Sequence, residues 1–163
     1  AGGLRARGRG AGDLAAPPRR VAEAWLGDLG AGYGGAPAEI LAGGLPSAGR
    51  DLVAVTGIDY HSVCPHHLLP SRGVAHVAYI PGGKVVGFGQ LVRLVDALAH
   101  RLVVEEDLAR DVADALVAHL GARGAACVLA AIFSAGVAEV GVTSTSRSAI
   151  TAATVFLKYD RNR

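Results

Sequence analysis

The sequence predicts an α+β fold in a single domain, with a mostly antiparallel sheet and helices on one face. Helical and strand-like periods occupy separate stretches of the 163 residues, 51% of which are hydrophobic and only 18% charged. A chain of this size and apolar content can bury one core, and segregated helices and strands are typical of α+β folds. We expect a flexible tail over residues 1–16 and one domain over residues 17–163.

Two helical stretches precede the predicted strands. Residues 17–30 begin with two prolines, place Val21, Trp25 and Leu29 on one stripe, and end at a glycine. Proline in the first turn and glycine at the end are typical of a helix. Residues 37–45 are expected to form a shorter helical piece.

A longer helical stretch, residues 90–120, divides into two helices that meet near residues 103–105. Apolar residues recur at helical spacing in both, at Leu91, Leu94, Val95, Leu98 and Leu102 and then at Leu108, Val112, Leu116 and Leu120. The acidic residues at 105–107 suit the positive N-terminal end of the second helix. We therefore expect two amphipathic helices here, packed by these stripes.

Strand signals lie on both sides of that helical stretch. Residues 73–86 predict a hairpin around a Pro-Gly-Gly turn, with alternate side chains on opposite faces. The other predicted strands are residues 51–57, a short strand at Tyr60, the apolar run 125–133, and residues 140–146 and 150–159.

Charge and composition exclude several classes of partner. The 16 basic and 14 acidic side chains give a net charge of +2, too small a surplus for a typical nucleic-acid binder. No apolar run approaches the roughly 18 residues that a membrane span needs. The two cysteines are too few for a disulfide framework, which favours the cytoplasm. We therefore expect a small-molecule partner rather than a nucleic acid or a membrane.

The densest chemical signal is Cys64-Pro65-His66-His67, which lies between predicted strands. Thiolate and imidazole suit Zn²⁺, and a cysteine and a histidine three residues apart can reach one metal from a turn. His66 is then free to act as a general acid near neutral pH. Packed or surface histidines are the structural alternative for the same pattern.

The surroundings of this motif closely resemble the GTP cyclohydrolase I family. The resemblance runs from about residue 18 to residue 128 and rests on residues 62–70 (SVCPHHLLP), 73–87 (GVAHVAYIPGGKVVG), 91–96 (LVRLVD) and 101–106 (RLVVEE). It implies the T-fold, in which an antiparallel sheet carries two helices and subunits join into a ring with sites between them. We expect a homo-oligomeric ring, decameric or smaller because the family's C-terminal helix has no counterpart here.

The resemblance also implies roles for individual residues. Glu106 matches the glutamate that accepts hydrogen bonds from the N–H groups of a purine or pterin-like ring. Cys64 and His67 match two zinc ligands, and His66 matches the histidine that handles protons. In the family, zinc-bound water attacks the purine C8, formate leaves, and the ring recloses to dihydroneopterin triphosphate.

Several positions depart from the family pattern. The third zinc ligand, with a nearby histidine and arginine, is expected at residues 132–138, which read IFSAGVA. We interpret Cys127 as a buried core thiol, and His61 is a candidate third ligand, with a half-buried strand histidine as the alternative. A zinc site needs at least three protein ligands, so we expect no cofactor unless zinc is retained in this way.

The residues expected to bind phosphate also differ from the family pattern. The family's Ser-Lys before Leu91 reads Gly89-Gln90, and its Gln before the ring-binding Glu is Glu105. A site with fewer cationic side chains would bind a triphosphate less tightly. We assign substrate binding to Glu106, Arg93 and Gln90, and catalysis to His66, His67, Cys64 and Glu105.

These departures predict a repurposed enzyme of specialised metabolism. It would catalyse a metal-independent condensation or cyclisation, through an imine or iminium, on a nitrogen-heterocyclic substrate. A genuine GTP cyclohydrolase I with a non-standard zinc site is the first alternative. A non-catalytic pterin- or purine-binding module is the second.

Overall fold

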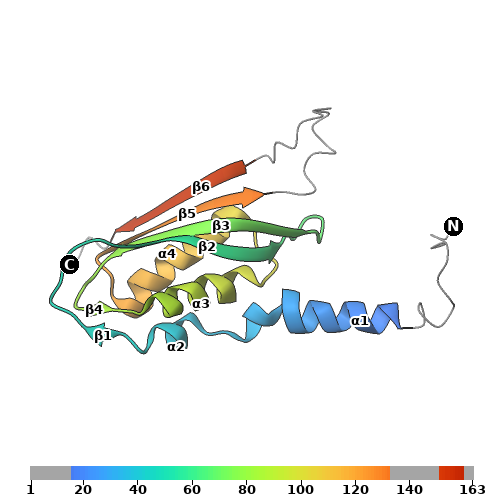
Figure 1. The fold of residues 1–163 in the computed structure, drawn as a ribbon, viewed down its shortest axis with the longest axis horizontal. Helices are drawn as coiled ribbons and strands as arrows, with labels where there is room; N and C mark the ends of the chain where they lie inside the picture. The colour runs from blue at the N-terminus through green and yellow to red at the C-terminus, as the bar shows by residue number, and fades with distance from the viewer. Residues whose placement is uncertain (1–15, 133–150, 160–163) are drawn as a thin grey trace.

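The computed structural model describes residues 16–132 and 151–159 (Figure 1). The chain begins with α1 (Pro17–Ala24), which continues as a π-helical turn (Trp25–Leu29) and a 3-10 turn (Ala31–Gly34). The elements that follow are α2 (Pro37–Leu41), β1 (Leu45–Pro46), β2 (Val53–Val63), β3 (Pro70–Ile80), β4 (Lys84–Val85), α3 (Phe88–Ala99), α4 (Glu105–Ala115) with its π-helical end (Leu116–Leu120), β5 (Gly124–Ile132) and β6 (Thr151–Tyr159).

Four strands form one antiparallel sheet in the order β2-β3-β5-β6. Helices α3 and α4 lie side by side against one face of it, and β1 pairs with β4 in a small separate ribbon (Figure 1). The predicted α+β class with helices on one face is therefore confirmed.

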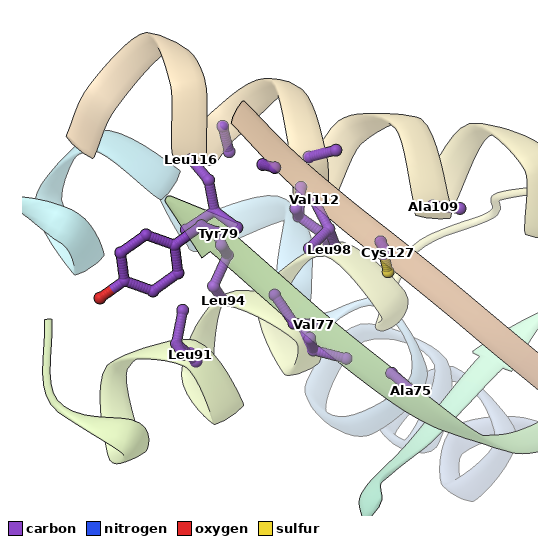
Figure 2. Packing of buried hydrophobic residues seen from close by; sticks show 14 of the residues in the cluster. Ala75, Val77, Tyr79, Leu91, Leu94, Leu98, Ala109, Val112, Leu116 and Cys127 are labelled. Atoms are coloured by element: carbon purple, nitrogen blue, oxygen red, sulfur yellow. The ribbon is translucent and has the colours of Figure 1, made fainter. Parts of the chain in front are cut away.

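The core lies between this sheet and the two helices. Ala75, Val77 and Tyr79 of β3 are buried and face the helices (Figure 2). The residues between them are half-buried on the opposite face. This alternation confirms the predicted face of the strand. The predicted helical stripes are also buried, as Leu91, Leu94, Val95 and Leu98 on α3 and Leu108, Val112, Leu116 and Leu120 on α4 and its extension.

The predicted hairpin over residues 73–86 is wrong. Strand β3 pairs with β2 on one edge and β5 on the other, so no edge is left for β4. After the turn the chain leaves the sheet, and β4 pairs with β1. The hydroxyl of Tyr79 accepts a hydrogen bond from the Val86 amide at 3.1 Å, which holds this departing segment.

Strand β2 joins two predicted strands into one. The prediction ended a strand at Gly57 and placed a short one at Tyr60, but pairing with β3 continues through a register shift between Val55 and Ile58. Gly57 has a φ of 78°, a left-handed conformation that glycine adopts without strain. The bulge changes the strand's periodicity, which explains why the sequence pattern broke there.

Three smaller predictions differ from the structure. The stripe on the first helix packs on no core, since α1 has no buried residue and Val21 is 54% exposed. Helix α2 ends at Leu41, and Leu45, which was predicted to be helical, belongs to β1. Leu102 lies in the connection after α3 and is 44% exposed.

The predicted strand at residues 140–146 lies outside the described residues. Within the described ranges, none of the helices has both the length and the apolar content to cross a bilayer.

Candidate functional site

A tight turn carries the Cys64-Pro65-His66-His67 motif and closes the hairpin between β2 and β3. The Cys64 amide donates to the Leu69 carbonyl at 3.0 Å, and the Leu68 amide donates to the Cys64 carbonyl at 2.9 Å. Leu68 has a φ of 54°, uncommon for a residue with a side chain. The backbone therefore presents the motif on a defined loop.

Within the turn, the thiol lies beside the first histidine. Cys64 Sγ is 3.8 Å from His66 Nδ1, and the rings of His66 and His67 meet edge to face with centroids 6.3 Å apart. Cys64 is half-buried, whereas both histidines are exposed. The exposed imidazoles can exchange protons with a ligand or with water.

The connection between α3 and α4 lies beside this turn. Val63 and Leu102 form an isolated parallel bridge, and the Val103 amide donates to the Val63 carbonyl at 3.3 Å. Both segments lie at the same end of the sheet (Figure 1). The fold thus brings the start of α4, with Glu105 half-buried and Glu106 exposed, to the end of the molecule that carries the motif.

A cavity of about 340 Å³ lies between the turn and this connection. Its lining residues are Tyr33, Pro65, Arg101, Leu102, Val103, Val104, Asp107 and Asp111. Arg101 is fixed in its wall, because its guanidinium donates to the carbonyls of Gly32, Gly35 and Ala97 at 3.0 Å. Burial, followed by the charge of Asp107, raises the pKa of Asp111 above its usual range.

The side chain of Gln90 makes two hydrogen bonds to the backbone. Its Oε1 accepts a hydrogen bond from the Gly87 amide at 2.9 Å, and its Nε2 donates to the Ile40 carbonyl at 2.9 Å. The side chain therefore caps α3 and ties it to α2. Arg93, one turn further on, is exposed, and its Nε donates to the Gly89 carbonyl at 3.3 Å. The predicted binding roles of these two residues stay predictions.

The donor set for a metal is incomplete within the described residues. No group of three or more His, Cys, Asp or Glu side chains gathers there in an arrangement that would hold a metal ion. His61 is exposed on β2, opposite Arg72, rather than half-buried. Cys127 is fully buried in the core, as expected, and burial raises the pKa of its thiol to about 12. The segment expected to hold the third ligand lies mostly outside the described residues.

Tyr60 was not among the site residues predicted from the sequence. This side chain is 3% exposed, and its pKa is raised mainly by burial and then by the charge of Glu105. Its ring packs against Gly73, where an added Cβ would lie 2.7 Å from the phenol oxygen. The signal was the alternation through Ile58, Tyr60 and Ser62, all buried in β2, which the bulge at Gly57 interrupted.

The antiparallel sheet with helices α3 and α4 on one face is the architecture of a T-fold protein. A solved structure of the same fold, the archaeosine synthase QueF-Like in its apo form, has a TM-score of 0.53 and 21% identity. The match covers 67% of this chain and 94% of that one, and at this identity it shows the fold alone.

The chain belongs to the GTP cyclohydrolase I family, whose model matches residues 8–162. Proteins named GTP cyclohydrolase 1 from Chromobacterium violaceum and Ralstonia nicotianae are 49% and 51% identical over 113 residues, 69% of this chain. The chain covers 55% and 54% of those two relatives, so it spans about half of their length. A third relative with this name, from Campylobacter lari, is 40% identical over 151 residues, 90% of this chain and 77% of that protein.

Proposed function

We propose that this chain catalyses the hydrolytic opening of a purine ring, converting GTP to formate and 7,8-dihydroneopterin triphosphate. The observation that carries the proposal is the placement of the Cys64 turn beside the start of α4, in a chain about half identical to relatives named GTP cyclohydrolase 1. This reverses the order of the expectations from sequence, because the relatives favour ring hydrolysis over a repurposed condensation.

The chemistry consumes one water and releases one formate for each GTP. In this proposal the carboxylate of Glu106 accepts hydrogen bonds from N–H groups of the purine ring and so fixes its orientation. The imidazole of His66, exposed in the turn, donates a proton to the ring nitrogen as its bond to carbon breaks. Arg93 contributes a cation toward the phosphates.

Zinc is the metal that the family implies. Among the described residues, Cys64 and His67 are the ligands on offer, and a third does not join them. Because a hydrolytic zinc site needs at least three protein ligands, the described residues do not complete the site.

The second candidate is the metal-independent condensation. Among the described residues it is favoured by the incomplete donor set and by Gln90, which stands in place of the family's lysine and whose amide is held by Gly87 and Ile40. An amine and an aldehyde would lose water to give an iminium, with a histidine moving the proton and Glu106 or Glu105 holding an N–H or ammonium group.

We also propose that the chain forms a homo-oligomer through the sheet. The sheet face opposite α3 and α4 has no covering element among the described residues (Figure 1). It carries apolar side chains, with Ala78 and Ala126 half-buried and Leu157 74% exposed. Exposed apolar surface of this kind marks an interaction site.

Incubation with GTP separates the two chemistries. Formate and a fluorescent pterin, formed by protein that carries close to one zinc per chain, support ring hydrolysis. Protein without metal that releases no formate, yet joins an amine to an aldehyde, supports condensation. Exchange of Glu106→Gln then distinguishes catalysis from simple binding, since a binding module loses ligand affinity but has no turnover to lose.

A further inference from the structure

A second cavity lies at the end of the sheet far from the Cys64 turn. It encloses about 500 Å³ and is lined by Ser47, Ala48, Gly49, Arg50, Pro81, Gly82, Gly83 and Arg123. Strand β3, which has 11 residues, separates the two regions by about 33 Å at 3.3 Å per residue. In Figure 1 this end carries β1 and β4, so a ligand here would not touch a substrate at the Cys64 turn of the same chain.

The lining of this cavity contains two arginines and no carboxylate. Arg50 is exposed and Arg123 half-buried, and neither forms an ion pair with an acidic side chain of the described chain. Neither guanidinium donates a side-chain hydrogen bond within that part of the protein. Asp51, the neighbour of Arg50, is not among the lining residues. The cavity therefore holds uncompensated positive charge.

A backbone turn with unpaired amide donors lies between the segments that carry the two arginines. The Arg123 amide donates to the Ile80 carbonyl at 2.9 Å, and the Ser47 amide donates to the Gly83 carbonyl at 3.0 Å. These bonds fix residues 81–83 between the segments that carry the arginines. The amides of Gly82 and Gly83 donate no hydrogen bond within the described chain.

We propose that this cavity binds the phosphate group of a small phosphomonoester. A guanidinium presents a planar fork of N–H donors that matches a phosphate, and successive backbone amides in a turn add further donors to an anion. The cavity is larger than a bare ion, so it has room for the remainder of the molecule. The site is independent of the proposed ring hydrolysis.

The test titrates inorganic phosphate and glycerol 3-phosphate into the protein by calorimetry at constant ionic strength. We expect saturable binding of one phosphate per chain, weakened at least tenfold in the double variant Arg50→Ala, Arg123→Ala. The single variant Arg50→Ala changes an exposed loop residue and should weaken binding without affecting folding. Tighter binding of the ester than of free phosphate would identify the ester as the preferred source of the anion.

One control matches the loss of a charge. Arg19→Ala removes a guanidinium that pairs with Glu23, far from the cavity lining, and should bind phosphate as the parent does. The proposal is overturned if no saturable binding occurs, or if the double variant binds within twofold of the parent. A loss in Arg93→Ala without a loss in the double variant would place the phosphate at the candidate functional site and also overturn it.

Discussion

The two cysteines occupy opposite environments. Cys64 is half-buried in a turn beside an exposed imidazole, whereas Cys127 is fully buried on β5 among core residues (Figure 2). Burial raises the pKa of Cys127 to about 12, because a thiolate is poorly solvated in an apolar interior. The same residue type therefore has a chemical role available in one place and a packing role in the other.

Thiol labelling measures this difference. Because burial raises the pKa of Cys127, its thiol stays protonated at pH 8, and the side chain is also inaccessible. We expect native protein to take up one equivalent of iodoacetamide, at Cys64, and denatured protein to take up two, as read by mass spectrometry. Cys64→Ser should take up none until it unfolds; rapid labelling of Cys127 in that native variant would contradict the assignment.

Gln90 illustrates how a predicted binding residue acquires a structural role. Replacing Gln90 with Ala removes two hydrogen bonds, one to the Gly87 amide and one to the Ile40 carbonyl. We expect a loss of about 1–3 kcal/mol in the free energy of unfolding, measured by urea denaturation. The KM for GTP of the folded fraction should stay close to that of the parent.

Gln90→Glu is the matched variant for this prediction. A carboxylate still accepts from Gly87 but cannot donate to Ile40, so its stability should lie between those of the parent and the alanine variant. Unchanged stability together with a large rise in KM would instead support the substrate-binding role predicted from sequence.

At the scale of elements, one glycine sets how closely the N-terminal segment approaches α3. The Gly32 amide donates to the His100 carbonyl at 3.0 Å, and Arg101 Nε donates to the Gly32 carbonyl at 3.0 Å. An added Cβ at Gly32 would lie 2.2 Å from the Ala97 carbonyl oxygen. Because that oxygen belongs to the backbone, the two segments would have to separate.

A pair of variants isolates this contact. Gly32→Ala should lower the free energy of unfolding by about 1–3 kcal/mol through overpacking. Gly34→Ala lies in the same 3-10 turn and meets nothing within 4 Å, so it should change stability by less than about 0.5 kcal/mol. Equal effects in the two variants, measured by thermal unfolding, would show that the close approach does not matter.

The elements that the sequence predicted best are those with a local signal. The stripes of α3 and α4 follow helical spacing and are buried as expected. The hairpin failed because alternation marks a strand's faces but does not name its neighbours, and β3 is paired on both edges. Likewise, the Cys64 motif was visible in the sequence, but its position beside α4 depends on the bridge between Val63 and Leu102, which no local pattern encodes.

At the scale of the whole molecule, the two layers leave one sheet face open. The exposed Leu157 lies on that face, opposite Ala126 in the register of β5 and β6. In an oligomer built on this face, a charge at Leu157 would have to be desolvated, which is costly without a partner.

Leu157→Asp should therefore reduce the molar mass found by light scattering toward that of a single chain. Leu26→Asp is the control, because Leu26 is 81% exposed on the N-terminal π-helical turn, and its mass should match the parent's. A monomeric parent, or the same mass in both variants and the parent, would contradict assembly through the sheet.

The most direct test of ring hydrolysis is the amount of formate released per GTP by the purified chain, with its zinc content measured on the same sample. We expect formate and dihydroneopterin triphosphate in equal amounts, and their loss in both Glu106→Gln and His66→Ala while the folded state is retained. Zinc-supplemented, folded protein that binds GTP but releases no formate would contradict the account.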